Sequence, residues 1–307
     1  MIHVQSLEDI SLRASWLTVG VFDGVHRGHQ QVIGALAVGA GQTGAPAVVV
    51  TFWPHPASVL GNGHVRCLTT PSERVELLSM LQVDAVITQT FDSALAATSA
   101  EEFVARLKER LDFKHLLIGY DFALGKGREG NASRLIEIGR RLEYTVHVVP
   151  PLSDESGVVS STEIRKLVAT GEVVEAASLL GHAYSLSGLV VHGDARGRGL
   201  GFPTANIDYP REKILPSNGV YACWATVDGR RYRAAVNVGI RPQFHTGAGA
   251  PLVEAYLLDF DADLYGVEVR LDFVARLRDE QRFSSVPELV NQIRRDVLST
   301  RELLIEK

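Results

Sequence analysis

Cysteine is nearly absent from this chain, which has only two among its 307 residues. Cys67 and Cys223 lie far apart in the sequence, and neither belongs to a CxxC pair. This spacing argues against a disulfide framework and against a structural zinc site. It is typical of a protein kept in a reducing cytosol.

Long hydrophobic runs and blocks of basic residues are absent as well. No stretch approaches the ~18 unbroken apolar residues of a membrane span, and the opening MIHVQSLEDI has neither the basic nor the apolar region of a secretory leader. The formal net charge is −5 and the pI is near 6.1, which disfavours a nucleic-acid backbone as the main partner. We therefore expect a cytoplasmic protein, a monomer or weak homo-oligomer, with no nucleic-acid and no membrane partner.

The first half of the chain alternates short apolar runs with amphipathic stretches. Right-handed crossovers wind such an order into an open parallel sheet, so the pattern predicts a Rossmann-like α/β fold. Ser72 is expected to cap one helix, and Ser99 with Glu102 has the spacing of a capping box at another. The predicted strands are 16–22, 45–52, 83–91, 115–122 and 145–151, and the predicted helices are 29–42, 71–82, 99–111 and 132–144.

The character of the sequence changes after Gly181. Two further helices are predicted at 161–171 and 172–181, and beyond them short β-rich runs are separated by Gly, Pro and Asp. We therefore expect two domains, an N-terminal one over 1–182 and a C-terminal one over 183–307.

The β-rich half contains clear turn and helix signals. Asp228-Gly229 lies between two β-rich runs and is a hairpin signal. Crowded short strands with turns favour a small barrel or sandwich. Ser285 and Glu288 have capping-box spacing and begin a helix that ends the chain.

Two histidines lie three positions apart in the segment FDGVHRGHQ, between a predicted strand and a predicted helix. A metal site at His26 and His29 would need a third ligand, and the segment is neither HExxH nor close to a cysteine. Two exposed residues of a first helical turn are the structural alternative. However, a strand, a glycine turn and a helix N-terminus form an anion site in α/β folds, and Gly24 and Gly28 leave room for a phosphate. The context favours a polyphosphate ligand, held by neutral or protonated imidazoles.

Three other segments carry residues suited to a nucleotide site. TFWPHP (51–56) ends a predicted strand and offers aromatic walls for a flat ligand. GYDFALGKGREGN (119–131) mixes glycines with basic residues, and VVSSTEIRK (158–166) brings hydroxyls and a guanidinium to a helix start. Each also has a structural interpretation: a rigid strand-exit loop, a solvated turn, and a capping box of Ser160 with Glu163.

In this order, FDGVHxGH, TFxPHP, GxDFxxGKGRxG and SSTxIR resemble the prokaryotic FAD synthetases, a family of bifunctional riboflavin kinases and FMN adenylyltransferases. The HxGH element alone is similar to nucleotidylyltransferases in general, which transfer AMP or CMP. The resemblance implies that His26, His29 and Arg165 are catalytic in an N-terminal adenylyltransferase domain. The implied ATP contacts are Phe22, Gly24, His26, His29, Ser161, Thr162 and Arg165, and the implied flavin contacts are Phe52, Pro54, His55, Pro56 and Asp121.

The second half carries its own glycine-rich element, HGDARGRGLGFPTANI (192–207), which is neither GxGxxG nor a Walker A P-loop. The hydroxyl of Thr204 and the amide oxygen of Asn206 lie two residues apart, so they share a face in extended chain. Hard oxygen ligands suit Mg²⁺ on an ATP phosphate, although Thr and Asn also fill many ordinary turns.

GxGFPTAN, NGVYA, AVNVGIRP and VEAYLLDFDADLYG resemble the flavokinase domain of the same family, a small closed β-barrel with a C-terminal helix. The resemblance implies that Thr204 and Asn206 hold Mg²⁺ with ATP and that the glycine loop, including Gly201, covers the nucleotide. It also implies that Glu254 takes the proton from the 5′-hydroxyl of riboflavin. Without the resemblance, Glu254 would be interpreted as an ordinary carboxylate on a strand.

The whole chain is thus expected to be a transferase that needs Mg²⁺ and ATP. The C-terminal domain would phosphorylate riboflavin to FMN, and the N-terminal domain would transfer AMP from ATP to FMN, giving FAD and pyrophosphate. Glu163 and Ala195 depart from the family pattern. Two alternatives stay open, namely an enzyme with one decayed site and a non-catalytic RNA-binding protein built from an α/β module and an OB-like barrel.

Overall fold

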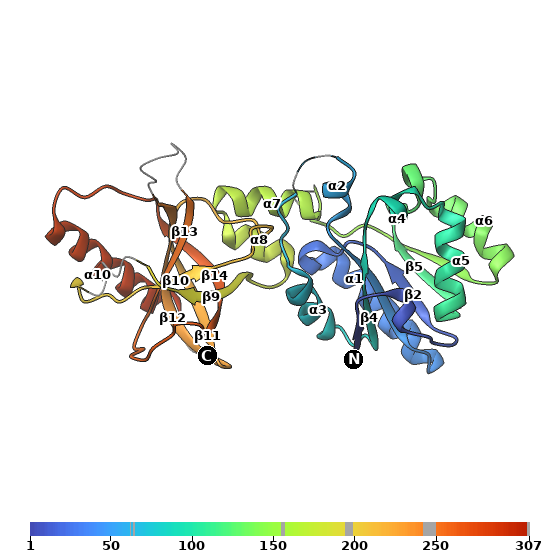
Figure 1. The fold of residues 1–307 in the computed structure, drawn as a ribbon, viewed down its shortest axis with the longest axis horizontal. Coiled ribbons are helices and arrows are strands. Elements are labelled where there is room, and N and C mark those ends of the chain that lie inside the picture. The colour runs from blue at the N-terminus through green and yellow to red at the C-terminus, as the bar shows by residue number, and fades with distance from the viewer. Residues whose placement is uncertain (62, 64, 155–156, 194–198, 242–249, 306–307) are drawn as a thin grey trace. The chain divides into compact units, whose positions relative to one another are not determined.

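A computed structural model describes residues 1–61, 63, 65–154, 157–193, 199–241 and 250–305 of the chain. The chain divides into two compact units, Met1–Ser161 and Thr162–Lys307 (Figure 1). Within the ranges described, no helix combines the length and the apolar character needed to cross a membrane.

The N-terminal unit contains a six-stranded sheet whose neighbouring strands run parallel. Its strands are β1 (Ile2–Val4), β2 (Trp16–Val19), β3 (Ala47–Trp53), β4 (Ala85–Thr90), β5 (His115–Gly119) and β6 (Thr145–Val149). Their order in the sheet is β1-β4-β3-β2-β5-β6. The chain winds from β2 through β3 to β4 and then returns to add β5 and β6 on the other side. The carboxyl ends of β2 and β5 are therefore the topological switch point, where open α/β sheets bind ligands.

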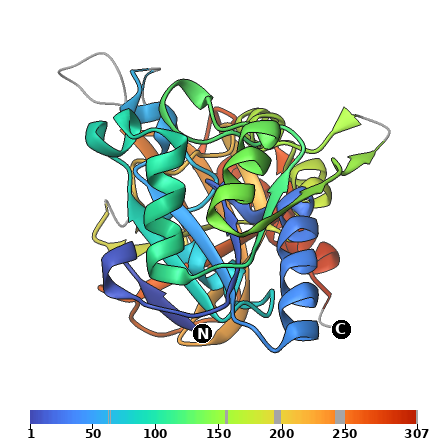
Figure 2. The ribbon, with the colours of Figure 1, turned by 90° about the vertical axis from the view of Figure 1, so that its right-hand side faces the viewer.

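Helices cover both faces of this sheet, as Figure 2 shows. They are α1 (Arg27–Thr43), α2 (Pro56–Val59), α3 (Pro71–Ser79), α4 (Ser93–Ala97), α5 (Ala100–Leu111) and α6 (Ala132–Leu142). Residues of α5 and α6 join one hydrophobic cluster, and residues of α1 and α3 join the other. Val48 and Val49 of β3 are both buried but belong to opposite clusters, because successive strand residues point to opposite faces. The predicted Rossmann-like architecture is confirmed.

The starts of two helices test the predicted caps. Thr70, not Ser72, caps α3, because a proline occupies the first helical position and the residue before it becomes the cap. The hydroxyl of Thr70 accepts from the backbone N–H of Glu73 at 3.3 Å, and the Glu73 carboxylate accepts from the Thr70 N–H at 2.8 Å. Ser99 and Glu102 form the predicted capping box at α5.

The C-terminal unit is built around a closed barrel in the order β10-β13-β12-β11-β14-β9. Its strands are β9 (Tyr184–Val191), β10 (Ala205–Asp208), β11 (Gly219–Val227), β12 (Arg230–Arg241), β13 (Ala250–Leu257) and β14 (Glu268–Arg278). Neighbouring strands pair antiparallel. Asp228 and Gly229, with φ of 46° and 75°, form the predicted hairpin turn between β11 and β12. A closed barrel leaves no free strand edge, and the barrel prediction is confirmed.

Helices pack around this barrel. Within the C-terminal unit, α8 (Val173–Leu180) contacts β9 and β14, and α10 (Val286–Leu303) contacts β11, β12 and β14. Before them comes α7 (Ser161–Thr170), and the N-terminal unit also holds a short antiparallel pair of β7 (Ser153–Asp154) and β8 (Gly157–Val158). The expected C-terminal helix is α10, and Ser285 is its cap.

Candidate functional site

The histidine segment lies at the switch point of the N-terminal sheet. It follows β2. The TFWPHP segment ends β3, and GYDF begins at the last residue of β5; β3 and β5 are the two neighbours of β2 in the sheet. Because the carboxyl ends of parallel strands meet at one edge, three of the predicted segments lie side by side there. Their adjacency comes from strand order, which the spacing of the motifs in the sequence does not contain.

Between β2 and α1 the chain makes a tight bend over residues 22–26, called here the histidine turn. Phe22, Gly24 and Val25 have φ of 51°, 79° and 41°, and two of these three are not glycine. Non-glycine residues in this region are strained, so surrounding contacts must hold them. His26 ends the turn as the cap of α1, and its Nδ1 accepts from the backbone N–H of His29 at 3.4 Å. The two imidazole rings stack with their centroids 3.6 Å apart.

The stacked rings are suited to donate hydrogen bonds without carrying charge. Since Nδ1 of His26 accepts this bond, the proton of the neutral ring lies on Nε2, which is a hydrogen-bond donor. Burial, followed by the electrostatic effects of His26 and Arg74, holds the pKa of His29 well below its usual range. His29 is therefore neutral near pH 7, and the structure favours neutral imidazole donors over a pair of cations.

Replacing His29 with glutamine is expected to make folding less sensitive to acid. The folded protein keeps His29 neutral, whereas the unfolded chain protonates it near its ordinary pKa of 6.5. Below about pH 6.5 the unfolded state binds more protons than the folded state. The contribution of neutral His29 to the free energy of unfolding is therefore fully present above that pH and is lost as the pH falls. When the pH is lowered from about 7.5 to about 5.5, the free energy of unfolding should fall by about 1 kcal/mol more in the parent than in the variant, as measured by chemical denaturation. Equal losses would contradict the lowered pKa.

Phe22 contacts one of the two imidazoles, and Gly28 makes room for the other. Phe22 is only 5% exposed and packs edge-to-face on His29, with the ring centroids 5.2 Å apart. A Cβ added to Gly28 would lie 3.1 Å from Cε1 of His26, so this glycine makes room for the imidazole itself. The backbone N–H of Gly24 donates to the hydroxyl of Thr69 at 3.0 Å.

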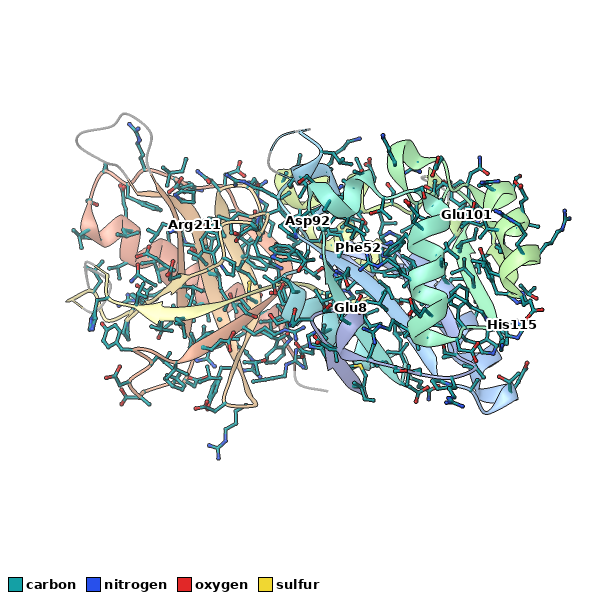
Figure 3. The ribbon with its side chains drawn as sticks, turned by 45° about the vertical axis from the view of Figure 1, so that its right-hand side comes forward. Glu8, Phe52, Asp92, Glu101, His115 and Arg211 are labelled. Carbon is teal, nitrogen blue, oxygen red and sulfur yellow. The ribbon has the colours of Figure 1, made fainter. Side chains whose placement is uncertain are left out.

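Phe52 lies within the hydrophobic core of the N-terminal unit (Figure 3). It is 9% exposed, and its ring lies 5.7 Å from that of Phe91 and 6.1 Å from that of Phe103. Its flavin contact stays a prediction.

The rest of TFWPHP forms the exit from β3. His55 caps the short helix α2, and its Nδ1 accepts from the backbone N–H of Ala57 at 3.2 Å. Pro54 is exposed, while Pro56 is half-buried as the first residue of α2. The chain therefore leaves β3 through this segment and enters α2 at the carboxyl edge of the sheet.

The segment after β5 is braced against the start of α5. The carboxylate of Glu129 accepts from the backbone N–H of Ala100 at 2.8 Å. Gly125 has φ of 78°, and a Cβ there would lie 2.5 Å from the nitrogen of Ala100. Arg128 donates to the carbonyl oxygen of Asp121 at 3.0 Å, and Asp121 itself is exposed. These contacts give the predicted loop a defined shape.

The start of α7 holds the last predicted element of the ATP site. The hydroxyl of Ser161 donates to the carbonyl oxygen of Asp23 at 2.9 Å, which links Ser161 to the histidine turn within the N-terminal unit. Arg165 donates to the hydroxyl of Thr162 at 3.2 Å. The division between the two compact units falls between Ser161 and Thr162.

Of the two positions that depart from the family pattern, one can be described. Glu163 forms an ion pair with Lys166 at 3.1 Å, so its carboxylate has a cation on its own helix. Ala195 lies outside the described residues, as do Arg196, Gly197 and Arg198 of the glycine loop.

In the barrel, Asn206 and Glu254 are direct neighbours on adjacent strands. Asn206 of β10 pairs with Glu254 of β13, which in turn pairs with Asn237 of β12. Val253 and Ala255 beside Glu254 are buried, so strand alternation puts Glu254 and its two partners on the outer face of the barrel. The predicted metal ligand and the predicted base therefore share one row. Asn237 lies in the AVNVGIRP motif, but its sequence position predicted no role for it, because only the strand register places it beside Glu254.

The amide oxygen of Asn206 is suited to bind a ligand. The residue is 8% exposed, and its Oδ1 is buried with no hydrogen-bond partner among the described residues. A Cβ on Gly193 would lie 2.1 Å from Nδ2 of Asn206, so that glycine makes space for the amide. Two residues earlier, Thr204 is exposed. Amide and hydroxyl oxygens are hard donors that fit Mg²⁺.

The described end of the glycine loop rests beside this row. Gly201 has φ of 85°, a conformation that favours glycine. Phe202 packs edge-to-face on Tyr256 of β13, with the ring centroids 5.5 Å apart. His192 stacks on Tyr265 at 3.8 Å, so both ends of the loop contact aromatic residues that follow Glu254 in the chain.

Replacing Gly193 with alanine is expected to impair phosphorylation of riboflavin. The new methyl group would overlap the side-chain amide of Asn206 and force it to move. Misplacing a positioned group by about 1 Å can cost on the order of 10²-fold, and we expect a loss of this order in kcat/KM. Adenylyl transfer to FMN by the same protein serves as the control and should be unchanged. Normal kinase activity would rule out a role for the Asn206 position.

Comparison with known proteins assigns the family. A model described as FAD synthetase matches residues 9–163, and one described as riboflavin kinase matches residues 180–304. A relative from Bacillus subtilis, named bifunctional riboflavin kinase/FMN adenylyltransferase, is 35% identical over 92% of this chain and 90% of its own. A relative of the same name from Escherichia coli is 37% identical over 93% of this chain and 91% of its own.

A solved structure shares the architecture of the full chain. It is described as a macrolide-efflux protein from Streptococcus pneumoniae, has a TM-score of 0.88 and 33% identity to this chain, and matches over 98% of both chains. The two family models and the relatives, which span nearly the whole sequence, confirm the resemblance found in the motifs. The chain belongs to the bifunctional riboflavin kinase/FMN adenylyltransferases, transferases that use ATP to make FMN from riboflavin and FAD from FMN.

Proposed function

We propose that the switch-point edge of the N-terminal sheet is the adenylyl-transfer site and that the Asn206–Glu254 row of the barrel is the kinase site. The domains would meet near residues 182 and 183. The observation that supports this division is the arrangement of the motifs: strand order brings the histidine turn, the β3 exit and the loop after β5 to one edge of the N-terminal sheet, and strand register sets Asn206 beside Glu254 in the barrel.

For adenylyl transfer, an oxygen of the FMN phosphate attacks the α-phosphorus of ATP. The bond from that phosphorus to the bridging oxygen breaks, and pyrophosphate leaves. We assign His26 and His29 as N–H donors to the triphosphate, where positioned donors stabilise charge that grows on the leaving group. Arg165 is proposed to stabilise the same growing negative charge with its permanent positive charge. Phe22, Gly24, Ser161 and Thr162 are proposed as further ATP contacts.

The flavin of FMN is proposed to bind beside the β3 exit and the loop after β5. Flat ligands suit apolar walls with a few polar groups, and these segments offer both. Their exposed or half-buried members offer more surface to the ligand than Phe52, which is 9% exposed. The proposed contacts are Phe52, Pro54, His55, Pro56 and Asp121.

For the kinase reaction, Glu254 takes the proton of the riboflavin 5′-hydroxyl. The hydroxyl oxygen attacks the γ-phosphorus of ATP, and ADP leaves. Thr204 and Asn206 would hold Mg²⁺, and the buried Oδ1 of Asn206, which has no hydrogen-bond partner within the part of the chain that the structure describes, supports that assignment. When bound, the ion neutralises charge on the phosphate oxygens. Gly201 is proposed to let the loop close over the nucleotide.

The direct test is incubation of the purified protein with riboflavin, ATP and Mg²⁺, followed by chromatography of the flavins. FMN should appear first and FAD later, and chelating the metal should stop both steps. Supplying FMN in place of riboflavin tests adenylyl transfer alone. Product from only one step would support an enzyme with one decayed site.

We also propose a cellular location, an oligomeric state and a range of partners for the enzyme. We expect a cytoplasmic monomer or weak homo-oligomer without nucleic-acid or membrane partners, as its acidic net charge and its small-molecule substrates suggest. Light scattering at several concentrations would test the oligomeric state, and RNA binding that weakens with salt would contradict the last expectation.

A further inference from the structure

Arg74 of α3 has a buried side chain and belongs to none of the sequence motifs described above. It is 0% exposed. Its Nη1 donates to the hydroxyl of Thr51 at 2.9 Å and to the carbonyl oxygen of Phe52 at 3.0 Å, both at the end of β3. Its Nε and Nη2 donate to the hydroxyl and the carbonyl oxygen of Thr69, each at 3.4 Å. Nη2 also lies 3.9 Å from Oδ1 of Asp23.

The partners of this guanidinium hold the histidine turn. Oδ1 of Asp23 accepts from the backbone N–H of Thr69 at 3.0 Å, and the Thr69 hydroxyl accepts from the N–H of Gly24 at 3.0 Å. The hydroxyl of Thr51 donates to the carbonyl oxygen of Val21, just before the turn, at 2.8 Å. The guanidinium therefore joins the turn, the end of β3 and the segment before α3 into one network.

The turn needs such support. Phe22 and Val25 occupy the left-handed region, which persists in non-glycine residues only when the surroundings hold it. Buried polar networks rigidify a site when their members are satisfied. The planar fork of arginine reaches several acceptors in fixed directions, which the single ammonium of lysine cannot do.

We propose that Arg74 is a positioning residue for adenylyl transfer, whose buried guanidinium fastens the histidine turn to the end of β3. It sets the place of His26 and His29 relative to the flavin-side segment without touching either substrate. This inference rests on the proposed role of the two histidines as ATP contacts.

The first test is Arg74→Lys in the full-length protein. The change keeps the positive charge but removes the planar guanidinium and its several N–H donors. We therefore expect kcat/KM for FAD formation from FMN to fall at least about tenfold. Phosphorylation of riboflavin by the same sample should be unchanged, and circular dichroism reports whether the fold is kept. An unchanged rate of FAD formation would overturn the proposal.

Thr51 provides a matched pair if the lysine variant does not fold. Thr51→Val removes the hydroxyl that links Arg74 to Val21 and nearly keeps the shape, whereas Thr51→Ser keeps the hydroxyl. Only the valine variant should lose FAD formation. Equal behaviour of the two variants would count against the network.

A double-mutant cycle separates positioning from a general structural role. Arg74→Lys is combined with His29→Ala, and kcat/KM for ATP is measured in the adenylyl-transfer reaction. If Arg74 acts through the histidines, its effect should shrink to within about threefold in the alanine background. The same loss in both backgrounds would refute positioning. Full activity of His29→Ala alone would refute the ATP site itself, whereas loss in His29→Ala with normal Arg74→Lys refutes only the inference drawn here.

Discussion

Glu254→Gln is expected to stop formation of FMN from riboflavin while leaving formation of FAD from FMN intact. The amide keeps the size of the side chain but cannot take a proton from the riboflavin hydroxyl. Positioned general bases contribute about 10²–10⁴-fold, so kcat should fall within that range. Flavin chromatography with riboflavin or FMN as the starting substrate measures the two activities separately.

Glu268→Gln is the matched control for this change. Glu268 is an exposed carboxylate on β14 of the same barrel, and the same substitution there should leave both activities unchanged. If Glu254→Gln phosphorylates riboflavin normally, the base is a different group. If it loses both activities together, the change has damaged the protein as a whole and not the chemistry of one site.

The double variant His26→Ala/His29→Ala is expected to lose FAD formation and to keep riboflavin phosphorylation. Removing one positioned donor from a site of developing charge lowers kcat by about 10²–10³-fold. We therefore expect the loss of two donors to lower kcat for FAD formation by at least that factor. The KM for ATP in adenylyl transfer should rise as well, because these donors also contact the bound triphosphate in the proposed site.

A second histidine pair in the same sheet serves as the control. His115 of β5 and His147 of β6 have ring nitrogens 3.1 Å apart, and His115 is the first residue of its strand. They therefore lie away from the carboxyl edge that carries the histidine turn. His115→Ala/His147→Ala should form FAD at the parental rate. Loss of FAD formation in this control would show that removing any histidine pair from the sheet is harmful.

These variants also decide between alternatives that the motifs left open. A protein with one decayed site would lack one activity before any substitution, so only one variant could show a loss. A non-catalytic RNA-binding protein is disfavoured by membership in a family of enzymes.

The strands and helices of the N-terminal half were predictable because their patterns are local. The helix expected over 132–144 is α6, and the strand expected over 115–122 begins at the same residue as β5. The strand β1, which has only three residues and pairs Ile2 with Ala85, was not predicted. Such pairing leaves no local pattern, because its partner is distant in the sequence and the strand is too short to show alternation.

By itself, the sequence determined the chemistry available to this protein. The types, spacing and order of its motifs placed it in a family and predicted two ATP-dependent steps. Only the tertiary structure decided which residues meet. Strand order brings three loops to the switch point, and the register of the barrel strands sets Asn206 beside Glu254. The buried Arg74 contacts both the segment before α3 and the end of β3. The physical reason is that strand pairing and burial join residues that are distant in the sequence, whereas sequence motifs record only local spacing.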